Sequence, residues 1–178
     1  MKRILLTGMS ATGKSTLIAE LAARGYNAVD LDQPAWSEMR TVADPSGDVI
    51  EEDWVWQEDR VRELLSTEDA GVLFVSGCAS NQILFYGQFD DIVLLTAPPE
   101  ILIERLRTRT TNSYGKKPEE LALVLHYQQT VEPLLRRIAT LELDSSAPIP
   151  KLLAAVLALA DGDIVRRRNP RGSSHNDI

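Results

Sequence analysis

A short run of residues near the N-terminus combines glycines, a lysine and a hydroxyl in the spacing of a phosphate-binding loop. Gly8-Met9-Ser10-Ala11-Thr12-Gly13-Lys14-Ser15 is a complete G-x-x-x-x-G-K-[ST] motif. In such a loop the backbone N–H groups surround the phosphates of a nucleotide, the lysine reaches the terminal phosphates and the hydroxyl binds Mg²⁺. The motif predicts these two roles for Lys14 and Ser15, with ATP and Mg²⁺ as ligands and Thr16 at the edge of the same site.

The residues on either side of this motif have the pattern that a phosphate loop needs. The apolar run Ile4-Leu5-Leu6 precedes it and predicts a strand, and Leu17-Ile18 and Leu21-Ala22 follow it at helical spacing. A helix that begins at the loop adds its positive end to the anion site. A glycine-bearing turn without a ligand is the alternative, and this context favours the nucleotide site.

Short apolar strands alternate with helical segments along most of the chain. We expect strands at 3–7, 28–32, 72–75, 92–95 and 140–144, and helices at 14–24, 51–67, 99–109, 118–138 (bent near Pro133) and 149–160. Residues 34–50 read as irregular. Such alternation is typical of an α/β fold in which helices cover both faces of a parallel sheet. Ligands then bind beyond the carboxyl ends of the strands, where the phosphate loop, Asp30, Asp32 and residues 76–81 fall.

Composition restricts the class of protein. The net charge of −7 argues against a duplex nucleic-acid partner, which needs a basic face. Cys78 is the single cysteine, so no internal disulfide forms. No apolar run approaches the roughly 18 residues of a membrane span. We therefore expect a cytoplasmic protein with one domain at 1–160 and a disordered, arginine-rich tail at 161–178, with neither nucleic acid nor membrane as a partner.

Over about residues 1–160 the chain resembles the P-loop small-molecule kinases related to shikimate kinase, gluconate kinase and adenylate kinase. Besides the phosphate loop, the segments that carry the resemblance are Asp30-x-Asp32, Gly71 to Gly77, Arg105 to Arg109, Lys116-Lys117-Pro118 and Leu135 to Thr140. The resemblance implies a P-loop NTPase fold, a three-layer α/β/α sandwich. Its five-stranded parallel sheet would have the order 2-3-1-4-5, and a lid would lie at about 109–117.

The same resemblance implies roles for the charged residues. Phosphoryl transfer needs the reacting oxygens held in line and positive charge around the moving group. That charge would come from Lys14 and from Arg109, Lys117 (or its neighbour Lys116) and Arg136. Asp30 would hold Mg²⁺ through water together with Ser15. Asp32 would accept a hydrogen bond from the acceptor hydroxyl. Pro148 would lie against adenine, with Arg105 or Arg109 on its other side.

The acceptor site departs from the shikimate kinase pattern. Where those kinases carry an arginine that binds the acceptor carboxylate, this chain has Trp54-Val55-Trp56, and Gly77-Cys78-Ala79 replaces a triple glycine. A bidentate carboxylate clamp is therefore missing. In the helix expected at 51–67 the two tryptophans cannot share a face, so one would be core while Trp54 lines the acceptor pocket. Trp54, Gly77, Cys78, Asp32 and Arg136 are the expected acceptor-binding residues.

These expectations favour an ATP-dependent kinase that phosphorylates a small molecule, most simply on a hydroxyl, with shikimate itself disfavoured. A nucleoside or nucleotide kinase is a second interpretation, for which Arg40, Arg60 and the tryptophans are the candidates. A third is a nucleotide-dependent switch that hydrolyses ATP and reports this to a protein partner. The lid argues against the switch, because lids exclude water from the transfer step.

Overall fold

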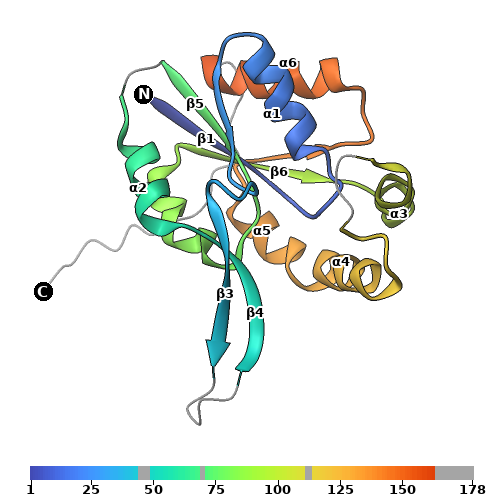
Figure 1. Cartoon of the computed structure of the whole chain (residues 1–178). Helices are drawn as coiled ribbons and strands as arrows, with labels where there is room; N and C mark the ends of the chain where they lie inside the picture. The colour runs from blue at the N-terminus through green and yellow to red at the C-terminus, as the bar shows by residue number, and fades with distance from the viewer. Residues whose placement is uncertain (44–48, 69–70, 111–113, 163–178) are drawn as a thin grey trace, which may run out of the picture.

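The computed structural model describes residues 1–43, 49–68, 71–110 and 114–162. At its centre is a five-stranded sheet in the order β2-β5-β1-β6-β7, and every strand pair in it is parallel (Figure 1). The strands are β1 (Lys2–Thr7), β2 (Asn27–Asp30), β5 (Val72–Ser76), β6 (Asp91–Thr96) and β7 (Leu141–Asp144). Counted along the chain without the hairpin described below, this order is 2-3-1-4-5, so the expected fold and sheet order are confirmed.

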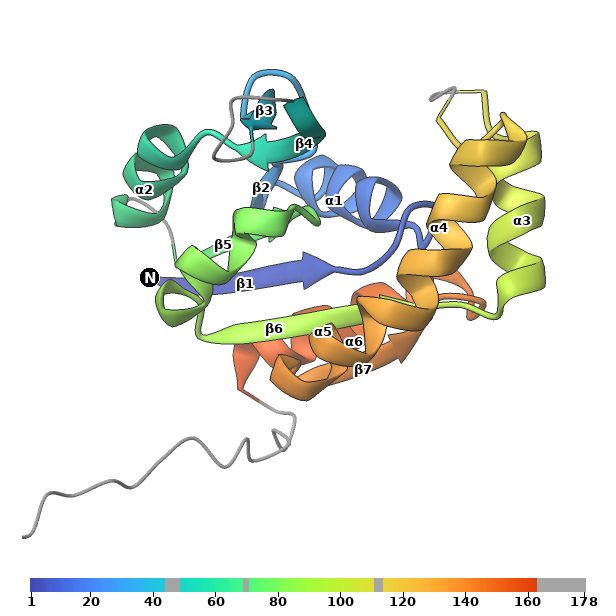
Figure 2. The same cartoon turned by 90° about the horizontal axis from the view of Figure 1, so that it is seen from below.

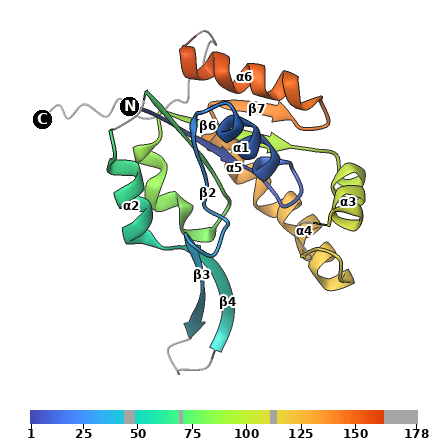
Figure 3. The same ribbon diagram turned by 45° about the horizontal axis from the view of Figure 1, so that its top comes forward.

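Helices cover both faces of the sheet. On one face α1 (Lys14–Ala23) and α6 (Ile149–Asp161) share a core with β1, and they lie together in Figure 3. On the other face lie α2 (Glu58–Ser66), the 3₁₀ helix η1 (Ser80–Gln88) and α5 (Glu132–Ile138). Strand β1 supplies both cores, because Ile4 and Leu6 face the first and Leu5 faces the second. The three-layer arrangement is therefore confirmed.

Two further helices lie past the carboxyl end of the sheet. Figure 2 shows α3 (Pro99–Thr108) and α4 (Pro118–Thr130) beyond the end to which β1 points. We expected a single bent helix over 118–138; instead α4 ends at Thr130 and α5 begins at Glu132. Pro133 lies in the first turn of α5. A backbone N–H at that position has no partner within the helix, so a proline there costs no hydrogen bond. The break therefore lies at the proline-bearing junction.

The segment after β2 differs from the expectation. Instead of an irregular stretch and a helix from 51, it forms an antiparallel hairpin of β3 (Ser37–Ala43) and β4 (Val49–Trp56), and α2 begins only at Glu58. Glutamates that favour a helix are thus outweighed by cross-strand pairing and by the β-favouring run Trp54-Val55-Trp56. Side chains two apart on a strand share a face, so the expectation that Trp54 and Trp56 point apart is wrong. The hairpin projects from the body of the molecule in Figure 1.

Two other predictions fall partly outside the described residues. Most of the predicted tail, 163–178, lies outside them, and α6 ends at Asp161 with Gly162 as its C-terminal cap. Within the predicted lid, 111–113 lie outside them too. Helix η1 was not expected from the sequence. In the part of the chain that the structure describes, none of the helices has the length and apolar character needed to cross a membrane.

Candidate active site

The phosphate loop connects β1 to α1 and has a shape that its glycines permit. A Cβ atom on Gly8 would lie 2.3 Å from the carbonyl oxygen of Leu95, so the loop packs directly against the end of β6. Ala11 has a φ of 66°, a left-handed conformation that costs a side chain about 1–3 kcal/mol. The Thr12 hydroxyl donates a hydrogen bond of 2.8 Å to the Met9 carbonyl. The loop is therefore held in one conformation by contacts within itself and with β6.

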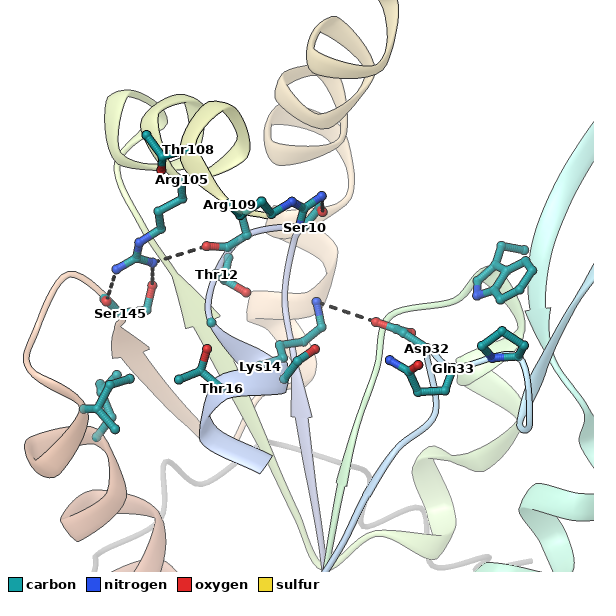
Figure 4. A pocket seen from close by; sticks show the side chains of 17 residues that line it. Ser10, Thr12, Lys14, Thr16, Asp32, Gln33, Arg105, Thr108, Arg109 and Ser145 are labelled. Carbon is teal, nitrogen blue, oxygen red and sulfur yellow. Dashed lines mark hydrogen bonds and ion pairs between the residues drawn. The ribbon is translucent and has the colours of Figure 1, made fainter. Parts of the chain in front are cut away.

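Lys14 lies buried at the mouth of this loop. Its ammonium donates to the carbonyl oxygens of Gly8 at 2.8 Å and Met9 at 3.2 Å. The same nitrogen is 3.8 Å from Oδ2 of Asp32 (Figure 4). The phosphate loop and the segment after β2 thus meet at one lysine, whose ammonium lies between the carbonyls of the loop and the carboxylate of Asp32.

A cavity of about 860 Å³ opens beside Lys14. Its walls contain several of the residues predicted from the sequence, namely Ser10 to Thr16, Asp32, Trp54, Arg105 and Arg109 (Figure 4). They also contain residues that sequence reasoning missed: Gln33, Pro34, Thr108, Ser145, Ile149 and Leu152. Pro34 and Gln33 directly follow the acidic strand end, which is a signal that the sequence offered. Ser145 follows β7, so its place at the carboxyl edge of the sheet was also deducible.

The expected metal-binding residues lie side by side. The Ser15 hydroxyl donates to Oδ2 of Asp30 at 2.6 Å, and Oδ1 of Asp30 accepts the N–H of Asp32 at 3.2 Å. Hydroxyl and carboxylate oxygens are the donors that Mg²⁺ prefers, and Mg²⁺ usually keeps waters and phosphate oxygens as its remaining ligands. The described residues contain no cluster of three or more His, Cys, Asp or Glu side chains with metal-binding geometry. Ser15 and Asp30 could hold such an ion if phosphate oxygens and waters completed its ligands.

Asp32 is fixed in the cavity wall by the loop after β5. The backbone N–H of Cys78 donates to its Oδ1 at 2.9 Å. A Cβ on Gly77 would come within 2.9 Å of both that oxygen and the Trp56 ring, so only glycine fits there. Burial raises the pKa of Asp32, and the nearby Lys14 charge and the Cys78 N–H partly offset this effect. A carboxylate held beside a lysine in this way can orient a hydroxyl and accept its proton.

Two arginines contact the phosphate loop: Arg105 in the last turn of α3 and Arg109, the C-cap of that helix. Arg105 donates to the Ser145 carbonyl at 2.6 Å, to the Ser145 hydroxyl at 3.0 Å and to the Ala11 carbonyl at 3.2 Å, as Figure 4 shows. Arg109 contacts the Ser10 hydroxyl at 3.4 Å and donates to the Tyr114 carbonyl, and burial lowers its pKa. Arg105 thus joins the phosphate loop to the segment after β7.

The structure does not bring every predicted residue into the cavity. Arg136 binds Glu142 at 2.9 Å and Glu132 at 2.8 Å instead. Lys117 is the N-cap of α4 and is absent from the cavity wall, as is Pro148, the N-cap of α6, whose expected place is taken by Ser145 and Ile149.

Gly77 and Cys78, which we expected to touch the acceptor, support Asp32 from behind rather than lining the cavity. Burial raises the pKa of the Cys78 thiol, which keeps it protonated.

A family model described as an AAA domain matches residues 4–126. This chain belongs to that AAA domain family. The match contains the phosphate loop, Asp30, Asp32, the hairpin and Arg105, so the residues that line most of the cavity lie inside the AAA domain. No match was found among curated proteins.

Solved structures share the fold of this AAA domain at low sequence identity. A shikimate kinase from Acinetobacter baumannii in complex with shikimate is 20% identical with a TM-score of 0.61, and the match covers 92% of this chain and 94% of that one. A gluconokinase from Sinorhizobium meliloti is 20% identical, with a TM-score of 0.52 over 90% and 94% of the chains. A deoxyadenosine kinase from M. mycoides with bound dATP is 12% identical, with a TM-score of 0.51 over 90% and 100%.

Proposed function

We propose that this AAA-domain protein is a kinase that transfers the γ-phosphoryl group of Mg-ATP to a hydroxyl of a small molecule. The observation that carries the proposal is the ion pair of Lys14 Nζ and Asp32 Oδ2, 3.8 Å apart in the wall of one cavity. It supports the proposal because a cation suited to phosphate and a carboxylate suited to a hydroxyl would then act at neighbouring points of the same wall. The family match supports nucleotide binding, and solved structures named as kinases share the fold.

In this proposal the protein positions two oxygens and stabilises charge. The acceptor oxygen forms a bond to the γ-phosphorus while the bond to the β,γ-bridging oxygen breaks, and ADP leaves. Asp32 accepts the hydrogen bond of the acceptor hydroxyl, orients it and takes its proton as the new bond forms. Lys14 stabilises the charge that gathers on the transferred group, and Arg109 reaches the same region from above the loop.

Ser15 and Asp30 are the residues that would hold Mg²⁺, because they already share a hydrogen bond of 2.6 Å at the start of α1. Bound Mg²⁺ would neutralise charge on the β- and γ-phosphates. Arg105, Ser145 and the apolar Ile149 and Leu152 form the far end of the cavity, where they suit the flat base of the nucleotide. Lys117 is absent from the cavity wall, so we assign no step to it. We assign no step to Arg136, because two carboxylates bind it.

The test is acceptor-dependent release of ADP. Purified protein with Mg-ATP is given a panel of sugars, nucleosides, amino alcohols and sugar acids, and ADP and phosphorylated product are measured together. A kinase shows ADP release that rises with one acceptor class, with one phosphorylated product per ADP. A release rate that no acceptor changes, with inorganic phosphate as the product, would contradict the proposal and indicate the switch instead.

A further inference from the structure

The hairpin that replaces the expected helix is tied to the body of the protein at its base. Asn81 of η1 binds both backbone groups of Trp56: its Oδ1 accepts the N–H at 3.0 Å and its Nδ2 donates to the carbonyl at 2.9 Å. On the other strand, the Ser37 hydroxyl donates to the Leu31 carbonyl at 2.5 Å. Because both strands are fixed next to β2 and η1, the side chains just beyond these points have defined positions.

One face of the hairpin runs from the core into the cavity. Trp56 is opposite Ser37 and Trp54 is opposite Met39, so these side chains share a face. Trp56 is fully buried, with its ring centroid 5.7 Å from that of Phe85. Trp54, the next residue on that face, lines the cavity that also contains Asp32. Met39 beside it is 56% exposed. The Trp54 indole thus continues this face of the hairpin from the buried Trp56 into the cavity wall.

Few charged side chains lie near Asp32 in the cavity. Among the described lining residues, its neighbours are Gln33, Pro34 and Trp54. The nearest cation is Lys14, which is already paired with Asp32 at 3.8 Å and bound to the carbonyls of Gly8 and Met9.

The arginines nearest the hairpin are held elsewhere. Arg40 pairs with Glu38 at 3.5 Å and Glu58 at 3.8 Å, and Arg60 lies over the Trp36 ring at 5.5 Å. A carboxylate or phosphate on the acceptor would therefore lie beside the Asp32 carboxylate without a cation dedicated to it.

We propose that the acceptor is a hydroxyl compound with a flat apolar face and no anionic group, such as a nucleoside or an aryl glycoside, and that Trp54 selects it. This inference rests on the proposed kinase function and names the substrate class of the same site. Trp54 stacks on the flat face of the acceptor while Asp32 receives its hydroxyl. An acid such as shikimate fits poorly, because a buried anion needs a paired cation.

The first test compares matched acceptors. Phenyl β-glucoside and phenyl β-glucuronide share a sugar ring and an aryl group but differ by one carboxylate, and methyl β-glucoside lacks the aryl group. A set of nucleosides, shikimate and gluconate complete the panel. We expect the neutral aryl or nucleoside compounds to have a kcat/KM at least about 10-fold above their anionic or non-aromatic partners. Preference for the glucuronide, shikimate or gluconate would overturn the inference while leaving the kinase proposal intact.

The second test removes the indole. Trp54→Ala should raise the KM of the preferred acceptor about 10-fold or more, with kcat and the KM of ATP little changed. Trp54→Tyr, which keeps a flat ring, should restore most of the affinity. Leu84→Ala is the control, because it removes an apolar side chain that is 50% exposed on the neighbouring η1. An acceptor KM that is equal in the parent and in Trp54→Ala would overturn the inference.

A binding measurement separates failure of the inference from failure of the kinase proposal. If no acceptor stimulates ADP release, calorimetry with the neutral and acidic compounds in the presence of ADP still reports on the site. Heat from neutral flat compounds that Trp54→Ala abolishes supports the acceptor class even though transfer is absent. If neither class binds, or only acids bind, the assignment of Trp54 is wrong.

Discussion

The two walls of the cavity are built in different ways. The nucleotide wall, formed by the phosphate loop, is held largely by contacts close in sequence: Lys14 binds the carbonyls of Gly8 and Met9, and Thr12 binds Met9. Strand β6 and Arg105 support it from more distant segments. The acceptor wall depends on contacts between distant segments, such as Cys78 with Asp32 and Asn81 with Trp56. A short motif therefore specifies most of the first wall. The second wall depends on a hairpin and on the packing of segments that are far apart in the sequence.

The largest expected effect is on the nucleotide wall. Lys14→Ala removes the cation at the mouth of the loop, and we expect kcat to fall about 10³-fold, because a preorganised donor to developing charge is lost. The rise in melting temperature that Mg-ATP causes should disappear as well. Thermal denaturation with and without Mg-ATP measures this. Lys151→Ala on the exposed side of α6 is the control. An undiminished ATP-dependent rise would show that the nucleotide does not bind here.

The next effect separates the two walls. Asp32→Asn keeps the shape of the side chain but removes the proton acceptor, so kcat should fall about 10²-fold while ATP affinity stays near that of the parent. Steady-state kinetics with varied ATP and acceptor report both quantities. The exposed Asp161→Asn, at the end of α6, should behave like the parent. Equal turnover in Asp32→Asn and the parent would remove Asp32 from the mechanism.

A smaller effect tests whether the acceptor wall depends on its distant contacts. Asn81→Ala removes two hydrogen bonds to Trp56, each worth about 1 kcal/mol. We expect about 1–3 kcal/mol less stability and a several-fold higher acceptor KM, with the KM of ATP unchanged. Urea denaturation and kinetics measure the two effects. Ile83→Ala on the same helix is the control, since that side chain is 67% exposed. A parallel rise in both KM values would mean that the walls are not independent.

The smallest effect concerns Glu132, which lies away from both walls. Burial raises the pKa of Glu132, and its hydrogen bond with Arg136 only partly offsets this. Since the pKa is higher in the folded state, the folded protein binds more protons in this range. Its free energy of unfolding therefore falls as pH rises from the ordinary value of 4.5 to the raised folded pKa, and is constant above it.

Glu132→Gln removes that slope, so the stability of the variant relative to the parent should increase as pH rises through this window. We expect a change below about 1 kcal/mol, because Glu142 keeps Arg136 paired. Urea denaturation at a series of pH values measures it, with the exposed Glu104→Gln as the control. If the stability of Glu132→Gln and of the parent changed with pH in the same way, the raised pKa of Glu132 would be contradicted.

The difference between the walls also decides what the sequence could predict. The phosphate loop and the alternation of strands and helices follow from motifs and periodicity, which are local. The expectation that Asp30 acts together with Ser15 came from the resemblance, and the two side chains share a hydrogen bond. The sheet order came from resemblance and is confirmed. The hairpin was missed because Glu51 and Glu52 favour a helix, whereas pairing with β3 is a non-local interaction. The alternation in Trp54-Val55-Trp56, which is typical of a strand, was the available signal.

Arg136 and Ser145 show that position in the chain alone does not decide which side chains reach the site. A basic residue near the last strand was assigned to catalysis from its position in the chain, but Glu132 and Glu142 lie within reach and bind it. Ser145 was overlooked because a serine after a strand carries no motif. Its role as a partner of Arg105 depends on the packing of α3 against the loop. Which of several plausible side chains reaches a site depends on the neighbours that compete for it.

The close approach of Gly8 to Leu95 has a consequence for the order of events during synthesis. The ribosome releases the nucleotide-binding motif among the first residues, but β6, which supports it, emerges only after the whole first half of the domain. Until residue 96 has left the exit tunnel, the motif has no partner strand on that side and cannot hold its bound shape. A growing chain should therefore gain affinity for ATP late and abruptly, and truncated chains that end before β6 should fail to bind it.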